Sequence, residues 1–277
     1  MEAFKPSPAL APYVTDIWAY EIPASLQTGA AATLTLLPDG FPTMCFVYKD
    51  PLQAAHGAQR WSMRSAVCGF QARPMYVSCA GEAAGLTVRF TPWGLPCFVP
   101  SPLEEAVDRR VACRDLFPAS IIESLESELS ELPTSLARVR RVEAFLMTQL
   151  RVDGMDPLVR AVVAASSSSR AMSEIAHHVG ASERTMERRF RRAVGVPPKM
   201  FSRVARLQRA LRRHEQRASW AESALDAGYY DQAHLIRDAK ELLGVSPDAL
   251  YAPGRNDIAE GFQSLARETR LASTLFR

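Results

Sequence analysis

The strongest constraint on this chain is an internal repeat in its C-terminal half. One unit begins at Ile175-Ala176 and a second at Ser223-Ala224, and each continues through a glycine, a short polar residue, an arginine and a closing Gly-Val-x-Pro. The offset is 48 residues up to the first glycine and 49 beyond it, which places one extra residue in the turn of the second unit. Repetition at a fixed period predicts two copies of one supersecondary unit.

The first unit has the parts of a helix-turn-helix. Helices are expected over residues 172–179 and 183–193. Gly180 can adopt the positive φ that ends the first helix, and Ser182 can cap the second by accepting hydrogen bonds from its free backbone N–H groups. A capped helix with a polar outer face fits a DNA major groove. That outer face, at spacings of three and four residues, consists of Arg184, Glu187, Arg188 and Arg191.

The second unit follows the same scheme, with helices expected over 220–227 and 232–242. Gly228 occupies its turn and Asp231 its cap, while Gln232 is the first polar residue of its second helix. The sequence predicts one connecting helix over residues 198–216, between the two units. We expect the basic residues on the polar face of this helix to contact DNA phosphates or nothing; they are Arg203, Arg206, Arg209, Arg213 and Arg217.

The charge is concentrated in the same region. From Arg184 to Arg217 there are twelve Lys and Arg residues against two acids, a local charge of +10 in a chain of net charge +3. The remainder therefore sums to −7. A basic block within an otherwise acidic chain is an electrostatic footprint for phosphates, although a solvated helix face has the same composition.

The stretch SEIAHHVGASERTMERRFRRAVGVPPKMFSRVARLQRA resembles the first half of the DNA-binding domain of the AraC/XylS transcription regulators. The stretch AESALDAGYYDQAHLIRDAKELLGVSP resembles the second half. The resemblance implies two units on a linker helix that enter successive major-groove segments of double-stranded DNA. It also implies regulation of transcription with RNA polymerase as a protein partner; activation is expected, and repression is the alternative. The residues it places at bases are Arg184, Glu187, Arg188 and Gln232, with His234 and Arg237 near bases or backbone.

The chemistry of these side chains supports base reading independently. Arginine can bind guanine O6 and N7, glutamine can bind adenine, and glutamate can accept from cytosine N4. Alternatives stay open at two positions: Glu187 can instead pair with Arg191 one turn away, and His234 can touch phosphate or be a passive surface residue. The second unit also departs from the family, because Ser223 and Ala239 stand where large core residues are usual. We therefore expect a weaker core there, with the second reading helix docking fully only on DNA.

The first 117 residues read as mostly β. Strands are expected over 33–37, 43–48, 75–79 and 86–90, with a Pro-Asp-Gly turn after the first. The segments CGFQARP and VRFTPWGLPCFV are similar to an N-terminal domain of some AraC/XylS members, which implies a cupin-like barrel that senses a small-molecule effector or dimerises. The candidate pocket residues are Trp18, Phe46, Tyr48 and Trp93; ordinary core packing is the alternative.

Residues 118–151 switch to helical periodicity with two apolar stripes separated by Pro133. We expect one stripe to cover the barrel and the other, with Val139 and Leu146, to join a homodimer. In the alternative, both stripes fold back and the chain is a monomer. The linker 151–156 contains a glycine and is expected to pivot.

The five cysteines all lie in the first half and none forms a Cys-x-x-Cys pair. We expect buried thiols, with a redox-sensing cysteine as the alternative. Neither a cofactor nor a metal site is expected, and His56 is the lone candidate ligand of this half. An enzyme with an accessory DNA domain would need a catalytic cluster that the residues do not supply. An architectural DNA binder would need only charge.

The resulting prediction is an α+β chain without enzymatic activity. Neither a bilayer-spanning segment nor a signal peptide is recognised, so a cytoplasmic location without membrane contact is expected. The expected divisions are a β-rich sensor domain over 1–117, a helical hairpin over 118–151, the double helix-turn-helix domain over 152–253 and a tail over 254–277.

Overall fold

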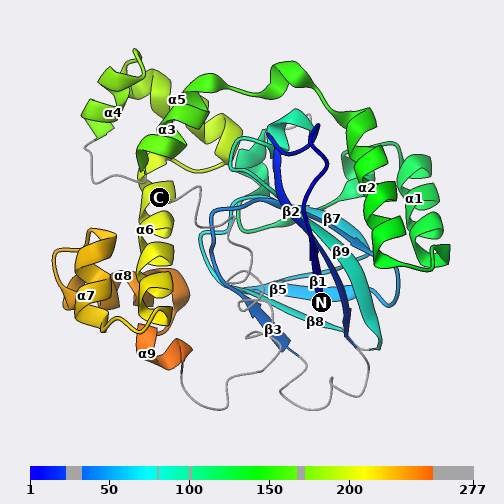
Figure 1. Cartoon of the computed structure of the whole chain (residues 1–277), viewed down its shortest axis with the longest axis horizontal. Coiled ribbons are helices and arrows are strands. Elements are labelled where there is room, and N and C mark those ends of the chain that lie inside the picture. The colour runs from blue at the N-terminus through cyan, green and yellow to red at the C-terminus, as the bar shows by residue number, and fades with distance from the viewer. Residues whose placement is uncertain (23–32, 80, 100–101, 167–171, 252–277) are drawn as a thin grey trace.

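The computed structural model combines two antiparallel β-sheets with helices on both sides of them (Figure 1). This arrangement confirms the expected fold class, a β-rich N-terminal half followed by a helical half. The expected tail at 254–277 lies outside the described residues. The structure describes residues 1–22, 33–79, 81–99, 102–166 and 172–251.

The β-rich half consists of two open sheets and not of a closed barrel. A six-stranded sheet has the order β1-β2-β9-β4-β7-β10, and a four-stranded sheet has the order β3-β8-β5-β6. Of the expected strands, 75–79 coincides with β8. The strands are β1 (Glu2–Phe4), β2 (Val14–Ile22), β3 (Thr33–Leu36), β4 (Thr43–Val47), β5 (Leu52–His56), β6 (Gln59–Met63), β7 (Ser65–Cys68), β8 (Met75–Cys79), β9 (Ala83–Phe90) and β10 (Arg110–Ala112).

The helical hairpin covers one face of the six-stranded sheet. It comprises α1 (Ala119–Glu131) and α2 (Ser135–Gln149), and the Thr134 side chain caps α2 by accepting from the Ala137 backbone N–H at 3.2 Å. The ring of Phe145 meets that of Phe46 in the sheet at 5.9 Å between centroids, edge to face.

Both apolar stripes of the hairpin fold back onto the sheet, so the expected dimer interface is wrong. Ile122, Leu125 and Leu129 of α1 belong to the same buried cluster as Val139 and Leu146 of α2. Val139 is 3% and Leu146 0% exposed. A helix pair with two stripes can bury both when it lies flat on a sheet, because each helix then faces the sheet and its neighbour together.

Helices of the C-terminal half surround one long helix, α6 (Figure 1). The apolar face of α6 is buried and includes Phe201, Val204, Leu207 and Leu211. Five of these helices begin where they were expected, because caps, prolines and turn glycines act locally. The helices are α3 (Pro157–Ser166), α4 (Met172–His178), α5 (Glu183–Val194), α6 (Pro198–Glu215), α7 (Trp220–Ala227), α8 (Gln232–Leu243) and α9 (Pro247–Leu250).

The N-terminal half shares a hydrophobic core with the first helical unit. Phe41, Phe70 and Trp93 belong to the buried cluster that contains the helices of the C-terminal half. The Phe70 ring lies 6.1 Å from that of Phe201 on α6. The two halves therefore pack through large buried side chains.

The junction between the halves is fixed, which corrects the expectation of a pivot. Arg151 donates from Nη2 to the carbonyls of Pro96 at 2.8 Å and Val99 at 2.6 Å. A side chain added at Gly154 would come within 2.8 Å of the Cα of Cys97. A segment that is held by these hydrogen bonds and by a close backbone contact at Gly154 has little freedom to rotate.

A buried ionic cluster holds the second helical unit against α6. Asp238 of α8 is 5% exposed and is bound by Arg203 of α6 through an ion pair, while the Tyr229 hydroxyl donates to its other carboxylate oxygen at 2.7 Å. Arg206 approaches the same carboxylate at 3.8 Å and lies over the Tyr229 ring at 4.5 Å. Glu241 is a second, exposed partner of Arg203.

This cluster replaces the large core residues that the second unit lacks. Ser223 and Ala239 are both 0% exposed, so their small side chains are packed closely. At the far end of the unit, the Trp220 ring stacks on His214 of α6 at 3.7 Å between centroids. The second reading helix is therefore docked without DNA, in contrast to the sequence-based expectation.

We predict that Asp238→Ala lowers the free energy of unfolding by on the order of 2–4 kcal/mol, because it leaves Arg203 and Arg206 half-buried without their shared counter-ion. Glu241→Ala removes the exposed partner of the same arginine and should cost at most about 0.5 kcal/mol. Urea unfolding of the full chain measures both. Equal losses for the two variants would contradict a structural role for the buried carboxylate.

Candidate DNA-binding interface

The first unit presents α5 as a capped helix with one buried and one exposed side. Gly180 has φ +65°, and the Ser182 hydroxyl accepts from the Thr185 backbone N–H at 3.2 Å. Met186 and Phe190 are 2% and 0% exposed and face the core. The expected reading residues are all exposed, namely Arg184, Glu187, Arg188 and Arg191.

The exposed residues of α5 differ in whether they already have a partner. Arg191 forms an ion pair with Glu187 at 2.8 Å, one turn away on the same helix. Arg189 is bound by Asp156 through two hydrogen bonds of 2.8 and 2.6 Å. In the described part of the chain, Arg184, Arg188 and Arg192 form no ion pair. DNA can therefore bind these three guanidinium groups of α5 without first breaking an ion pair.

The second unit presents α8 in the same way. Gly228 has φ +87°, and the Asp231 carboxylate caps α8 by accepting from the His234 backbone N–H at 2.7 Å. Gln232 and Arg237 are exposed. His234 is half-buried, with its ring edge-on to Tyr229 at 5.1 Å, so packing fixes its orientation.

Most arginines of α6 contact the second unit, which fits the alternative that they do not contact DNA. Arg203 and Arg206 belong to the Asp238 cluster. Arg209 donates to the Ala227 carbonyl at 3.2 Å, and Arg213 pairs with Asp226 at 2.6 Å. Arg217 is exposed. Part of the charge of the +10 segment is therefore already paired within the protein, and the net charge overstates what is available to DNA.

Sequence reasoning missed one exposed aromatic residue beside the second reading helix. Tyr230 is 87% exposed and lies directly before the Asp231 cap, whereas its neighbour Tyr229 is 3% exposed. A large exposed aromatic ring at the start of a reading helix is suited to contact with the sugar-phosphate backbone or a thymine methyl group. The sequence signal that could have revealed this residue is the Tyr-Tyr pair directly before the helix cap.

The four expected pocket residues do not line one pocket. Trp18 is on the face of the six-stranded sheet toward the other sheet. Phe46 and Tyr48 are in the cluster under the helical hairpin, where Arg138 lies over the Tyr48 ring at 4.2 Å. Trp93 is in the core shared with the C-terminal half, and its Nε1 donates to the Pro12 carbonyl at 3.1 Å.

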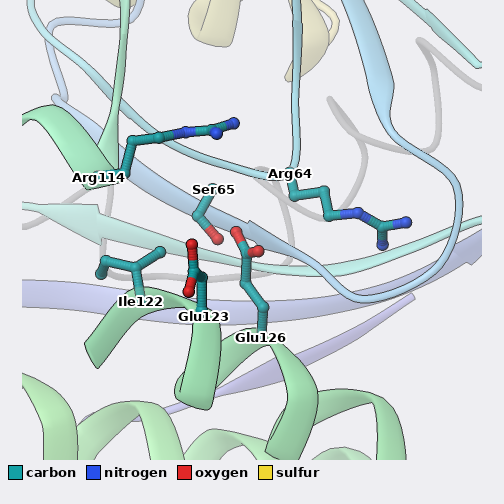
Figure 2. Close-up of a pocket in the computed structure, with 6 residues that line it drawn as sticks. All are labelled: Arg64, Ser65, Arg114, Ile122, Glu123 and Glu126. Atoms are coloured by element: carbon teal, nitrogen blue, oxygen red, sulfur yellow. The ribbon is translucent and has the colours of Figure 1, made fainter. Parts of the chain in front are cut away.

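A hollow of about 280 Å³ lies between the six-stranded sheet and α1. Figure 2 shows Glu123 and Glu126 reaching from α1 toward Ser65, with Arg114 on the opposite side. Its lining is mostly charged, unlike the apolar lining of typical small-molecule sites. Within the described residues, no group of three His, Cys, Asp or Glu side chains is arranged to hold a metal ion. No helix there is long and apolar enough to cross a membrane.

Two family models match the chain in separate regions. A helix-turn-helix domain matches residues 175–252, which contain α5, α6 and α8. A domain of unknown function, DUF6597, matches residues 2–112. A comparison with curated proteins finds no match.

Solved structures of ToxT from Vibrio cholerae are similar over most of the chain. The P21 form of ToxT has a TM-score of 0.49 at 9% identity, covering 84% of this chain and 96% of ToxT. Wild-type ToxT from strain SCE256 with a bound unsaturated fatty acid has a TM-score of 0.46 at 8% identity, covering 87% and 96%.

The matched helix-turn-helix domain contains two repeated units. Each unit has a glycine turn followed by a capped, exposed helix, and one linker helix, α6, connects the two units. This arrangement is the one that the sequence resemblance implies. The C-terminal half of the chain is therefore a helix-turn-helix domain with two repeated units.

Proposed function

We propose that the chain recognises a specific duplex sequence through α5 and α8. The supporting observation is the division of its arginines, since Arg184, Arg188 and Arg237 are exposed while those of α6 mostly hold the second unit. Guanidinium groups at Arg184 and Arg188 can bind guanine in bidentate fashion, and Gln232 can bind adenine.

The other expected contacts take supporting roles in this proposal. Glu187 accepts from cytosine after exchanging its pairing with Arg191, whose guanidinium then binds phosphate. Ser182 keeps its cap and directs the helix N-terminus at the DNA backbone. His234 and Arg237 contact bases or backbone next to Gln232.

We also propose that the N-terminal half carries the regulatory input, as a small-molecule effector, a second copy of the chain, or both. DNA as a partner fits a cytoplasmic protein that activates transcription with RNA polymerase. A homodimer needs a surface other than the buried stripes. On the hairpin, Leu136 and Met147 are 47% and 43% exposed and lie three turns apart on one side of α2.

We predict that binding of the full chain to a duplex selected from a random library weakens steeply with salt. The logarithm of the binding constant should fall by about 0.9 for each phosphate neutralised, per tenfold increase in salt. Fluorescence anisotropy at several salt concentrations measures the slope. Arg213→Ala is the control, because this guanidinium already pairs with Asp226, and it should leave the slope nearly unchanged. A flat salt response would contradict phosphate contact.

We predict that Arg188→Ala and Gln232→Ala lose discrimination at different base pairs, about one helical turn apart. Each should cost on the order of 1–3 kcal/mol on the selected duplex and much less on a duplex changed at that position. Arg189→Ala is a matched control on the same helix, since Arg189 is held by Asp156. Binding measured across all single-base variants of the site reports the outcome. Equal weakening on every duplex would remove the residue from the reading set.

A further inference from the structure

The six-stranded sheet presents a polar face to the four-stranded sheet. Tyr20 and Val47 on this face pack with Met75 and Val77 of the opposite sheet. The register of β2, β9, β4, β7 and β10 places the following side chains on it: Asp16, Trp18, Tyr20, Thr43, Cys45, Cys68, Thr87, Arg89 and Arg110. A space between two sheets is ordinarily filled with aliphatic side chains, so this face requires a chemical explanation.

Arg110 poses the sharpest problem on this face. Arg110 is 6% exposed, and its Nε donates to the Met75 sulfur at 3.3 Å. Within the described residues, no carboxylate forms an ion pair with it. A buried guanidinium needs an anion, because its transfer from water is otherwise very costly. The ionisable groups that interact with it are Cys45, Cys68 and Tyr20.

Cys45 is the group best placed to supply that anion. The Thr87 hydroxyl donates to its sulfur at 3.6 Å. A hydrogen bond from the Cys68 thiol lowers the pKa of Cys45 to about 6, against the opposing effect of burial and with further help from Arg110. The pKa of Cys68 is raised well above its usual value, first by that hydrogen bond and then by burial. Both shifts favour loss of the first proton from Cys45, with Cys68 keeping its own.

The remaining groups around the pair leave this assignment unchanged. Tyr20 stays a phenol, because burial raises its pKa far above neutrality. Burial also raises the pKa of the Cys113 thiol, which interacts with Cys45. Met75, which faces the pair from the opposite sheet, carries no charge. Cys45 and Cys68 are 6% and 3% exposed, so access is restricted, but a thiolate beside a thiol and a guanidinium has the charge arrangement of a reactive cysteine with a resolving partner.

We propose that Cys45 and Cys68 form a dithiol that peroxides oxidise. The Cys45 thiolate attacks one oxygen of hydrogen peroxide, the O–O bond breaks, and the products are a sulfenic acid on Cys45 and hydroxide. The Cys68 thiol then attacks the sulfenic sulfur, forming the disulfide and releasing water. Two electrons pass from the sulfurs to the peroxide. The proton that Cys68 loses leaves in the released water, and the hydroxide of the first step takes a proton from solvent.

Closing the disulfide must draw two strands together. Cys45 is opposite Ala66 and Cys68 is opposite Thr43, so the cysteines are diagonal neighbours on β4 and β7. Diagonal Cα atoms lie about 7–8 Å apart, at the limit that a disulfide spans. Only the three-residue edge strand β10 lies beyond β7, with Arg110 opposite Cys68, so the movement falls on β7 and β10.

The segment before β10 supports the first DNA-reading unit. A side chain at Gly195, at the end of α5, would come within 2.7 Å of the Val107 side chain and 2.8 Å of the Leu103 carbonyl. Displacement of β10 therefore acts on a close contact with α5. This regulatory consequence rests on the proposed function, whereas the oxidation itself does not.

The experiment treats the reduced full chain with hydrogen peroxide and maps its peptides by mass spectrometry without reduction. We expect a Cys45–Cys68 link with the loss of about 2 Da. Cys97 and Cys113 are built-in controls and should remain thiols, because burial raises the pKa of Cys97 to about 11 and that of Cys113 well above its usual value. Absence of the link, or earlier oxidation of the more accessible Cys79, would overturn the proposal.

Variants separate the two steps. Cys68→Ser should stop at the sulfenic acid, which dimedone then labels on Cys45, while Cys97→Ser should leave the link unaffected. Arg110→Met should slow oxidation at pH 7 by about tenfold or more, because the thiolate loses its cation. In the unsubstituted chain the rate should rise with pH and level off above about pH 6. An unchanged rate in Arg110→Met, or a dimedone label on another cysteine, would contradict the assignment.

A final measurement compares DNA binding by the reduced and oxidised full chain, using the selected duplex. We expect oxidation to change the affinity at least threefold and Cys68→Ser to abolish that change. A link that forms without altering affinity would refute the coupling and leave the oxidisable dithiol standing. A chain that binds no duplex in either state would refute the proposed function alone.

Discussion

The structure depends on the contacts of α6, which meets a different partner on each of its sides. Phe201 joins it to the first unit and to Phe70 of the N-terminal half. Arg203 and Arg206 join it to the second unit through Asp238. Gln208 donates to the Pro38 carbonyl in the turn after β3. Because one rigid helix carries all three contacts, the spacing of the two reading helices is set by the same element that meets the N-terminal half.

The ionic contacts of α6 explain how one segment can be strongly basic and yet only partly available to DNA. A guanidinium half-buried beside Asp238 contributes to folding, since its charge is already neutralised. One in solvent on α5 can release counter-ions when it meets phosphate. Burial also lowers the pKa of Arg212 to about 10, with Arg209 adding to the effect, so the arginines of α6 are crowded as well as paired. Charge along the sequence is therefore a guide to the region and not to the residues that contact DNA.

The sequence predicts the parts of this molecule whose causes are local. The turn glycines, the caps at Ser182 and Asp231 and the boundaries of α7 follow from a few neighbouring residues, and the structure has them where expected. The pairing of Arg203 with Asp238 spans 35 positions and gives no periodic signal. The same holds for the diagonal cysteines of β4 and β7, whose proximity depends on strand register. The sequence also does not distinguish the sheet face under the helical hairpin from the face toward the other sheet. Phe46 lies on the first face and Trp18 on the second, although the sequence suggests one pocket for both.

The shared core changes how a regulatory signal can reach the reading helices. A flexible linker would let the N-terminal half act by positioning two copies on DNA. Here Arg151 is fixed to two backbone carbonyls, and Phe70, Val107 and Pro38 all touch the helices of the first unit or α6. Signals therefore have to pass as small displacements of packed elements. Close-packed contacts transmit such displacements efficiently, because they cannot be compressed without moving a neighbour. A change in the sheet that shifts β10, or the turn at Pro38, must accordingly alter how α5 and α6 are held.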